Sequence, residues 1–176
     1  MDFGRLFDNI ASVTKESQLK LGYESVPFGI NYARSSLLHL LGDCDDGAVP
    51  DLLAEFAAQY RDTLGDITYR TVSNGYRIDI PTQGVDYVHS LVSDDDFLVQ
   101  FIKVIRDCTC TVDDVIAVFN RYSRKVVVEH IDNEDFDYLI YFEDGQPDAF
   151  WYCIDTQDIG MTYHRFTKED YLDFGF

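Results

Sequence analysis

The sequence predicts an α+β fold, and two changes in the spacing of its apolar residues are the main evidence. Apolar residues recur at helical spacing through most of the first 65 residues, alternate every second residue over 66–80, and alternate again in the last third. Short polar connections between the late strands favour antiparallel pairing. We therefore expect N-terminal and central helices packed on an antiparallel sheet, with an internal β-hairpin (66–80) and a C-terminal four-strand meander.

The N-terminal third is predicted to be helical. A first helix is expected to be capped by Asp2 and to stop at Gly22. Its apolar residues at helical spacing are Phe3, Leu6, Phe7, Ile10 and Val13. A break containing Pro27 and Gly29 follows. The next elements expected are a short buried helix over 35–41, a polar loop over 43–49, and a helix that begins near Pro50 and ends at Gly65.

The middle of the chain combines the hairpin with further helices. Asn74–Gly75 predicts a hairpin turn with positive φ angles. Pro81 closes the second strand, and a short helix is expected over 85–92. Ser93 followed by three aspartates predicts a capped helix start with acids in the first turn. Thr111, with Asp114 three residues later, predicts the start of another helix.

The last third is predicted to form a sheet. Candidate strands cover 126–131, 138–143, 150–154 and 161–165, Asp144–Gly145 is the clearest turn, and Thr167 is expected to cap a helix over 168–173. The second and third of these strands are apolar on both faces. Either helices cover both faces of this sheet, or an aromatic face is left for a ligand or partner. We expect one domain over residues 1–176.

The acidic balance limits the classes of partner. The chain has 14 Lys and Arg against 32 Asp and Glu, which gives a formal net charge of −18. Such a charge repels phosphate backbones, so nucleic acid is not the expected partner and a basic protein is. A winged helix-turn-helix over 97–122 is disfavoured for the same reason. A sheet that is apolar on both faces, or that has an uncovered edge, also predicts a homo-oligomer.

The N-terminus and the four cysteines predict a cytoplasmic protein without a membrane segment. The first residues lack the basic start and apolar run of a secretory signal, and no charge-free stretch is long enough to span a bilayer. Free thiols are then expected at Cys44, Cys108, Cys110 and Cys153. Cys108 and Cys110 have no second ligand pair, so we predict no metal and no cofactor.

No catalytic motif is present, so no catalytic residue is predicted. The sequence has no phosphate-binding glycine loop, no nucleophile elbow and no paired-histidine metal motif. A stretch in the last predicted strand is more informative, because His164 titrates near neutrality and Arg165 suits carboxylate or phosphate recognition. The candidate binding residues are Tyr138, Trp151, Tyr152, Tyr163, His164 and Arg165. The alternative is that Arg165 pairs with a local acid and His164 is an ordinary strand residue.

Two groups of residues resemble a known family. The first comprises 18–24, Tyr32 and 35–42, and the second comprises 136–142, Pro147–Asp148, 152–154 and 163–171. Together they are similar to an uncharacterised bacterial domain-of-unknown-function family of small proteins, over nearly the whole chain. The resemblance implies a bacterial cytoplasmic protein and assigns no activity, cofactor or partner.

Two functions remain open from the sequence. The first is a non-enzymatic cytoplasmic interaction module, an adaptor or inhibitor that binds a basic protein, suggested by the charge and by the aromatic residues of the last third. The second is a small-molecule-binding protein or enzyme with a pocket on the C-terminal sheet near His164 and Arg165. DNA mimicry by the acidic surface is a third hypothesis.

Overall fold

The computed structural model describes residues 2–131 and 133–175 and confirms the α+β class. The chain forms two compact units that divide between Val92 and Ser93, called here the N-terminal and C-terminal units. Each unit has its own antiparallel sheet. Whether the two units unfold together is a separate property, so the expectation of a single domain stays a prediction.

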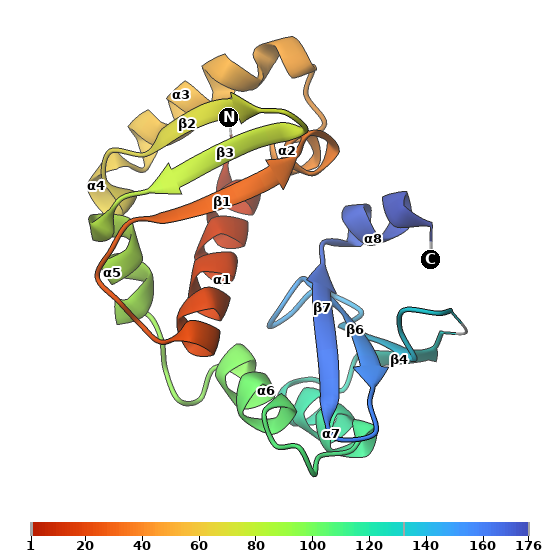
Figure 1. Cartoon of the computed structure of the whole chain (residues 1–176). Helices are drawn as coiled ribbons and strands as arrows, with labels where there is room; N and C mark the ends of the chain where they lie inside the picture. The colour runs from red at the N-terminus through yellow and green to blue at the C-terminus, as the bar shows by residue number, and fades with distance from the viewer. Residues whose placement is uncertain (1, 132, 176) are drawn as a thin grey trace. The chain divides into compact units, whose positions relative to one another are not determined.

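The N-terminal unit packs helices against one side of a three-stranded sheet (Figure 1). Its elements in chain order are α1 (Gly4–Leu21), β1 (Phe28–Ala33), α2 (Arg34–Leu40), the 3-10 helix η1 (Asp46–Ala48), α3 (Val49–Gln59), α4 (Arg61–Leu64), β2 (Thr68–Val72), β3 (Gly75–Ile80) and α5 (Thr82–Ser90). The N-cap residue of α1 is Phe3, without a side-chain cap, so the predicted cap at Asp2 is wrong; Asp2 lies one residue earlier, and its Oδ1 accepts the Gly4 N–H. Gly22 ends α1 with a φ of 94°, as expected for a glycine stop. No helix within the described ranges combines the length and hydrophobicity needed to cross a membrane.

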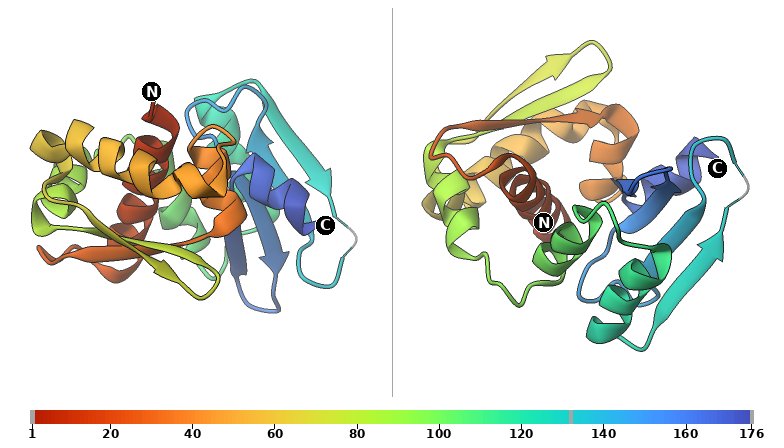
Figure 2. Two further views of the ribbon diagram at one scale, coloured as in Figure 1. Left: turned by 90° about the horizontal axis from the view of Figure 1, so that it is seen from above. Right: turned by 60° about the horizontal axis from the view of Figure 1, so that its bottom comes forward.

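The N-terminal sheet has one buried face and one polar face. Its strand order is β1-β3-β2, with both pairs antiparallel. The helices lie on one face of this sheet (Figure 2). Ile30, Ile78 and Ile80 are buried on that face, whereas Asn31, Arg77 and Asp79 alternate with them on the other. This alternation is the usual pattern of an antiparallel sheet with one solvated side.

The predicted hairpin is confirmed, but its predicted turn is wrong. Val72 pairs with Gly75, so the two connecting residues are Ser73 and Asn74, and neither Asn74 nor Gly75 has a positive φ. The glycine is explained by strand β1 instead. A Cβ at Gly75 would lie 2.0 Å from the backbone oxygen of Tyr32, so only a glycine allows β1 to approach this closely.

Strand β1 occupies part of the segment for which the sequence predicted only a break. Phe28 pairs with Ile80 and Ala33 with Gly75, over the full length of β3. Gly29 is again a position of close approach, because a Cβ there would lie 1.9 Å from Arg77 Nη2. This contact is with the far end of a flexible side chain, which can move, so Gly29 lies within a strand without being required by it.

The C-terminal unit confirms the predicted four-strand meander. Its elements are α6 (Phe97–Ile105), α7 (Val112–Tyr122), β4 (Val126–His130), β5 (Tyr138–Phe142), β6 (Trp151–Thr156), β7 (Met161–Phe166) and α8 (Lys168–Phe174). The strand order is β4-β5-β6-β7, and each strand pairs antiparallel with the next along the chain. Short connections leave no room for a crossover.

Two of the three predicted helix caps in this unit are confirmed. Thr111 and Asp114 form a reciprocal capping box on α7, and the Thr167 hydroxyl accepts a hydrogen bond from the Asp170 N–H on α8. The predicted cap at Ser93 is wrong. Helix α6 begins only at Phe97, and the aspartates form a turn before it, in which the Asp96 carboxylate accepts the Ser93 N–H at 3.1 Å.

Helices pack on both faces of the C-terminal sheet. On one face, aromatic rings of α6 and α7 meet rings of the sheet edge to face: Phe97 lies 4.9 Å from Phe142, and Phe101 lies 4.6 Å from Tyr152, between ring centroids. On the other face, Tyr171 of α8 joins a buried cluster with Leu139 and Cys153. Coverage by helices on both sides was one of the two alternatives that the sequence left open.

Candidate functional site

The six binding residues predicted from the sequence lie on opposite faces of the C-terminal sheet. Cross-strand pairing puts Tyr138, Tyr152, Tyr163 and Arg165 on the face that packs against α6 and α7, and puts Trp151 and His164 on the face that carries α8. The sheet therefore separates the two groups. No single pocket on one face of this sheet contains all six side chains.

Arg165 is engaged in a buried ion pair. Its Nη1 lies 3.4 Å from Asp148 Oδ2, and the two side chains are 2% and 10% exposed. The Tyr152 hydroxyl donates to the same carboxylate oxygen at 2.9 Å. Burial, followed by the negative charge of Asp148, raises the pKa of Tyr152 well above its usual value, so this hydroxyl remains a donor. The Arg165 guanidinium also lies 4.2 Å from the Phe150 ring centroid, a cation–π distance.

The opposite face carries a partly exposed aromatic cluster. Trp151 stacks on Tyr141 with ring centroids 4.1 Å apart, and His164 lies beside Phe166 at 5.7 Å. Tyr171 of α8 meets Trp151 at 5.2 Å. These rings pack against one another, and a binding role for the predicted residues stays a prediction.

The cysteines do not assemble a metal site. Within the described ranges, no three His, Cys, Asp or Glu side chains come together in a group that could hold a metal ion. All four cysteines are free thiols. Burial raises the pKa of the Cys153 thiol to about 12, so it stays protonated in the core at neutral pH.

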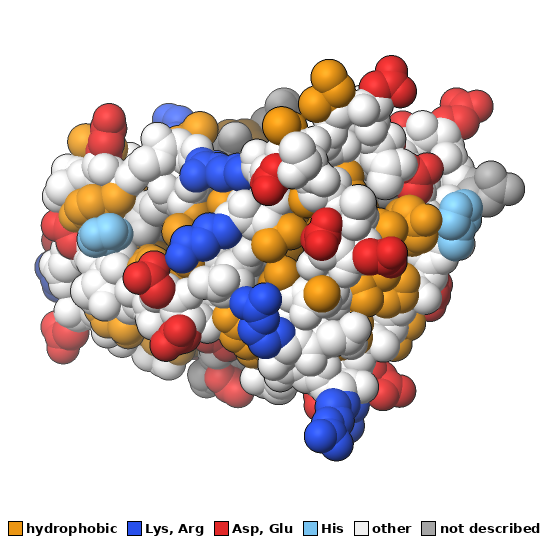
Figure 3. Space-filling view, turned by 90° about the horizontal axis from the view of Figure 1, so that it is seen from below, with side chains coloured by type: hydrophobic (Ala, Val, Ile, Leu, Met, Phe, Trp, Pro, Cys, Tyr) orange, Lys and Arg blue, Asp and Glu red, His pale blue; other side chains and the backbone are white. Residues whose placement is uncertain are grey.

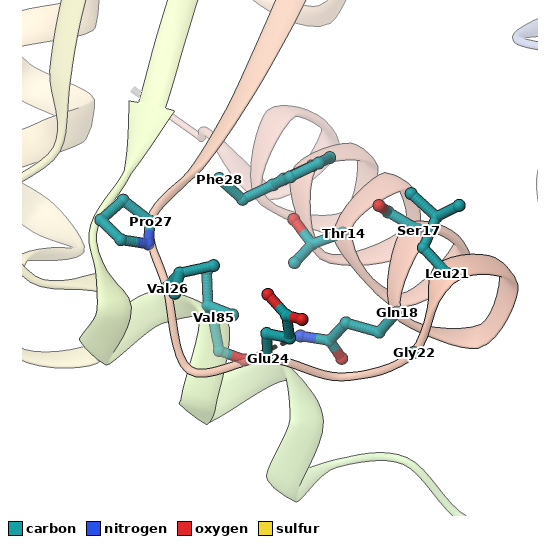
Figure 4. Close-up of a pocket in the computed structure, with 10 residues that line it drawn as sticks. All are labelled: Thr14, Ser17, Gln18, Leu21, Gly22, Glu24, Val26, Pro27, Phe28 and Val85. Atoms are coloured by element: carbon teal, nitrogen blue, oxygen red, sulfur yellow. Dashed lines mark hydrogen bonds between the residues drawn. The ribbon is translucent and has the colours of Figure 1, made fainter.

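A pocket of about 240 Å³ lies in the N-terminal unit (Figure 4). Its walls come from the C-terminal half of α1, the loop of residues 22–27, the start of β1, and α5. The side chains and backbone that line it belong to Thr14, Ser17, Gln18, Leu21, Gly22, Glu24, Val26, Pro27, Phe28 and Val85.

Two buried polar atoms in this wall have no hydrogen-bond partner within the protein. Thr14 is 1% exposed, and its Oγ1 is unpaired. Gln18 donates from Nε2 to the Val85 carbonyl oxygen at 3.0 Å, and its Oε1 is unpaired. Because a carbonyl can only accept, this bond fixes the orientation of the amide. An unsatisfied buried polar atom costs about 1–3 kcal/mol, so such atoms normally meet ordered water or a ligand.

The loop over the pocket is attached to α5 through one carboxylate. The Tyr23 hydroxyl donates to Asp86 at 2.6 Å, and the Ser25 hydroxyl donates to it at 2.8 Å. These two hydrogen bonds lower the pKa of Asp86. The Tyr23 ring also stacks on His89 with centroids 3.6 Å apart. The loop conformation that places Glu24 beside the pocket is therefore held by contacts outside the pocket.

This pocket was not predicted from the sequence, although the spacing along α1 contains a signal for it. The stripe of Leu6, Ile10 and Val13 continues at helical spacing into Thr14, Ser17 and Gln18. Polar side chains on the buried stripe of a helix need partners, and here two of them lack a partner within the protein.

One protein-family model matches nearly the whole chain. Residues 3–175 match the family described as "Domain of unknown function, E. rectale Gene description (DUF3877)". The chain belongs to this family. The resemblance to an uncharacterised bacterial family is therefore confirmed, and the family description assigns no activity. No curated protein and no solved structure matches the chain.

Proposed function

We propose that the protein binds a small molecule in the pocket of its N-terminal unit. The observation that supports this proposal is the pair of unpaired buried atoms, Thr14 Oγ1 and Gln18 Oε1, in the wall of one cavity. Glu24 is the one ionisable side chain among the described residues that line it. A binding role is favoured over acid–base catalysis. Such catalysis usually combines several positioned ionisable groups, and Glu24 is the one such group among the described lining residues.

The volume of the pocket limits the ligand to a small one. Drug-sized ligands occupy cavities of about 300–1,000 Å³, which is larger than the 240 Å³ here. At about 30 Å³ per water molecule in the liquid, the pocket holds the equivalent of about eight waters. A ligand of roughly that many non-hydrogen atoms is expected.

A fragment screen by two-dimensional ¹H–¹⁵N NMR tests this proposal. Binding is expected to shift the amide signals of Thr14, Gln18 and Gly22 saturably. The Thr14→Val variant keeps the shape but removes the hydroxyl, so it is expected to fold and to lose the shifts. Thr162→Val, at an exposed strand position of the C-terminal unit, is the matched control and is expected to bind as the wild type does. A screen in which no fragment shifts these signals, or in which Thr14→Val binds unchanged, would contradict the proposal.

A second candidate function is an interaction module for a basic protein, favoured by the net charge of −18. One face of the molecule shows acidic side chains interspersed with basic and hydrophobic ones (Figure 3). Affinity capture from a bacterial lysate at low and high salt tests this candidate, with an unrelated protein of equal net charge as the control. A basic protein that this chain alone retains at low salt supports it. Equal retention by the control refutes it.

We also retain the proposals of a homo-oligomer and of a cytoplasmic location. Strand β4 forms one edge of the C-terminal sheet, and Val128 on it is 40% exposed. An uncovered edge of this kind can pair with a second copy. Light scattering coupled to size-exclusion chromatography measures the mass directly, and a monomer at all concentrations refutes the oligomer.

Fractionation of cells that produce the protein tests the proposed cytoplasmic location.

A further inference from the structure

We infer that the ligand of the N-terminal pocket is a small organic cation, a primary ammonium group attached to a compact apolar body. This inference rests on the proposed function, that the pocket binds a small molecule, and goes on to name the chemical class. It follows from the kinds of atoms that the walls present.

The polar atoms of the pocket can accept hydrogen bonds, and the amide nitrogen that could donate is already used. Gln18 Nε2 is bonded to the Val85 carbonyl oxygen, so Oε1 is the free part of that amide. Figure 4 shows the Glu24 carboxylate pointing from the loop toward Thr14. An amide oxygen and a carboxylate accept only, and a threonine hydroxyl can accept as well. The complementary ligand group is therefore rich in donors, and an ammonium group supplies three of them.

The charges around the pocket favour a cation over a neutral donor. None of the described residues that line the pocket is basic. The pocket lies at the C-terminal half of α1, a helix of 18 residues, where the helix dipole presents its negative end. Glu24 adds a formal negative charge at the same place. A carboxylate or phosphate ligand would meet repulsion from both.

The remaining walls fit an apolar body next to the charged group. Phe28 and Val85 line the cavity together with Pro27, and the more exposed side chains of Leu21 and Val26 complete its lining. A bare metal ion would gain nothing from these side chains, whereas an aliphatic or aromatic group would bury surface against them. Benzylammonium, with about eight non-hydrogen atoms, matches the size that the volume allows.

Three probes of the same shape and different charge test the inference by NMR titration at low salt. They are benzylammonium, benzyl alcohol and benzoate. Benzylammonium is expected to shift the Gln18 side-chain NH₂ and the Gly22 amide saturably, with an affinity about tenfold or more above that of benzyl alcohol, because its hydrogen bonds are charge-assisted. Benzoate is expected not to bind.

Two matched variants test whether the preference for a cation depends on the carboxylate at the pocket. Glu24→Gln keeps the size of the side chain and removes its charge. Because Glu24 is exposed, the change is expected to weaken benzylammonium binding about two- to fivefold and benzyl alcohol binding little. Glu55→Gln, at an exposed position of α3, is expected to bind both probes as the wild type does.

Some outcomes contradict only the ammonium class of the ligand, and others contradict the pocket as a binding site. Equal affinity for the ammonium and the alcohol, unchanged affinity in Glu24→Gln, or pocket binding by benzoate overturns the ammonium inference and leaves the pocket as a binding site. So does a neutral fragment that binds when benzylammonium does not. Failure of every fragment and of all three probes to shift the pocket signals overturns the proposed function itself.

Discussion

Removal of the Asp148 carboxylate is expected to be among the most destabilising single changes in the C-terminal unit. Asp148→Ala removes the carboxylate that lies 3.4 Å from the Arg165 guanidinium, whose side chain is 2% exposed. It also removes the acceptor of the Tyr152 hydroxyl at 2.9 Å and of the Phe150 N–H at 2.8 Å. The variant therefore leaves a buried guanidinium and two further donors without this carboxylate.

The expected loss of stability follows from the burial of the ion pair between Asp148 and Arg165. Breaking a buried ion pair by removing one partner costs about 3–5 kcal/mol, because the remaining charge stays desolvated. For a chain of 150–250 residues, 1 kcal/mol shifts the Tm by about 2–4 °C, so the expected decrease is roughly 6–20 °C. The double variant Asp148→Ala/Arg165→Met removes both charges, and is expected to recover at least about 1 kcal/mol of the loss.

Differential scanning calorimetry and urea unfolding of wild type, both single variants and the double variant measure this coupling. The control is Lys103→Met, which breaks an exposed ion pair with Asp94 in the same unit and is expected to change stability by less than about 1 kcal/mol. The same scans test the prediction of a single domain, which requires one cooperative transition for the whole chain.

An Asp148→Ala variant that loses no more stability than the exposed control would contradict this prediction. So would losses of the two single variants that add, within about 0.5 kcal/mol, to the loss of the double variant. Either result would mean that the guanidinium reaches water or another carboxylate when Asp148 is absent. Arg165 would then be more available for ligand binding than its burial indicates.

Three further predictions concern a strand, a helix cap and a thiol. Gly75→Ala is expected to abolish the pairing of β1, because its Cβ would lie 2.0 Å from a backbone oxygen, and circular dichroism with thermal melting measures the loss. Hydrogen bonds from the Thr111 backbone and side chain lower the pKa of Asp114 below 3.8, so this carboxylate stabilises the fold above that pH and loses its effect as the pH falls through the lowered pKa. The stability difference between wild type and Asp114→Asn in urea is therefore expected to be present at pH 7 and to shrink in acid; a difference that grows in acid contradicts this. Cys153, with a pKa raised to about 12, is expected to resist a thiol reagent at pH 8 that labels the exposed Cys108, and equal labelling rates would refute its burial.

Local sequence patterns were sufficient for most of the fold. Helical spacing identified α1, α3, α6 and α7, alternation identified the hairpin and the meander, and side-chain caps at Thr111 and Thr167 lie where expected. These elements are specified by neighbours in sequence, which a pattern can show. The cap at Ser93 was misplaced, because the acids that suggest a first turn also form a turn of their own before Phe97.

Features that depend on distant contacts were missed. Strand β1 and the glycine at position 75 are explained only once β1 lies against β3, more than forty residues later in the chain. The N-terminal pocket was missed for the same reason. Thr14 and Gln18 continue the buried stripe of α1, but the cavity beside them exists only where α5 and the loop of residues 22–27 enclose it. The predicted binding residues of the C-terminal sheet were placed on the correct strands. Only the pairing register shows that they divide between its two faces.

The strand order of the N-terminal sheet predicts the order in which its strands assemble during folding. The hairpin of β2 and β3 closes over a two-residue connection, whereas Phe28 must find Ile80 across the intervening helices. Closing the longer loop costs more chain entropy, so β1 is expected to join after the hairpin has formed. Pulse-labelling hydrogen exchange during refolding should protect the β2–β3 amides before those of β1, and the reverse order would contradict this. A nascent chain that ends before residue 80 contains strand β1 without its partner strand, and so exposes a strand edge until synthesis passes that point.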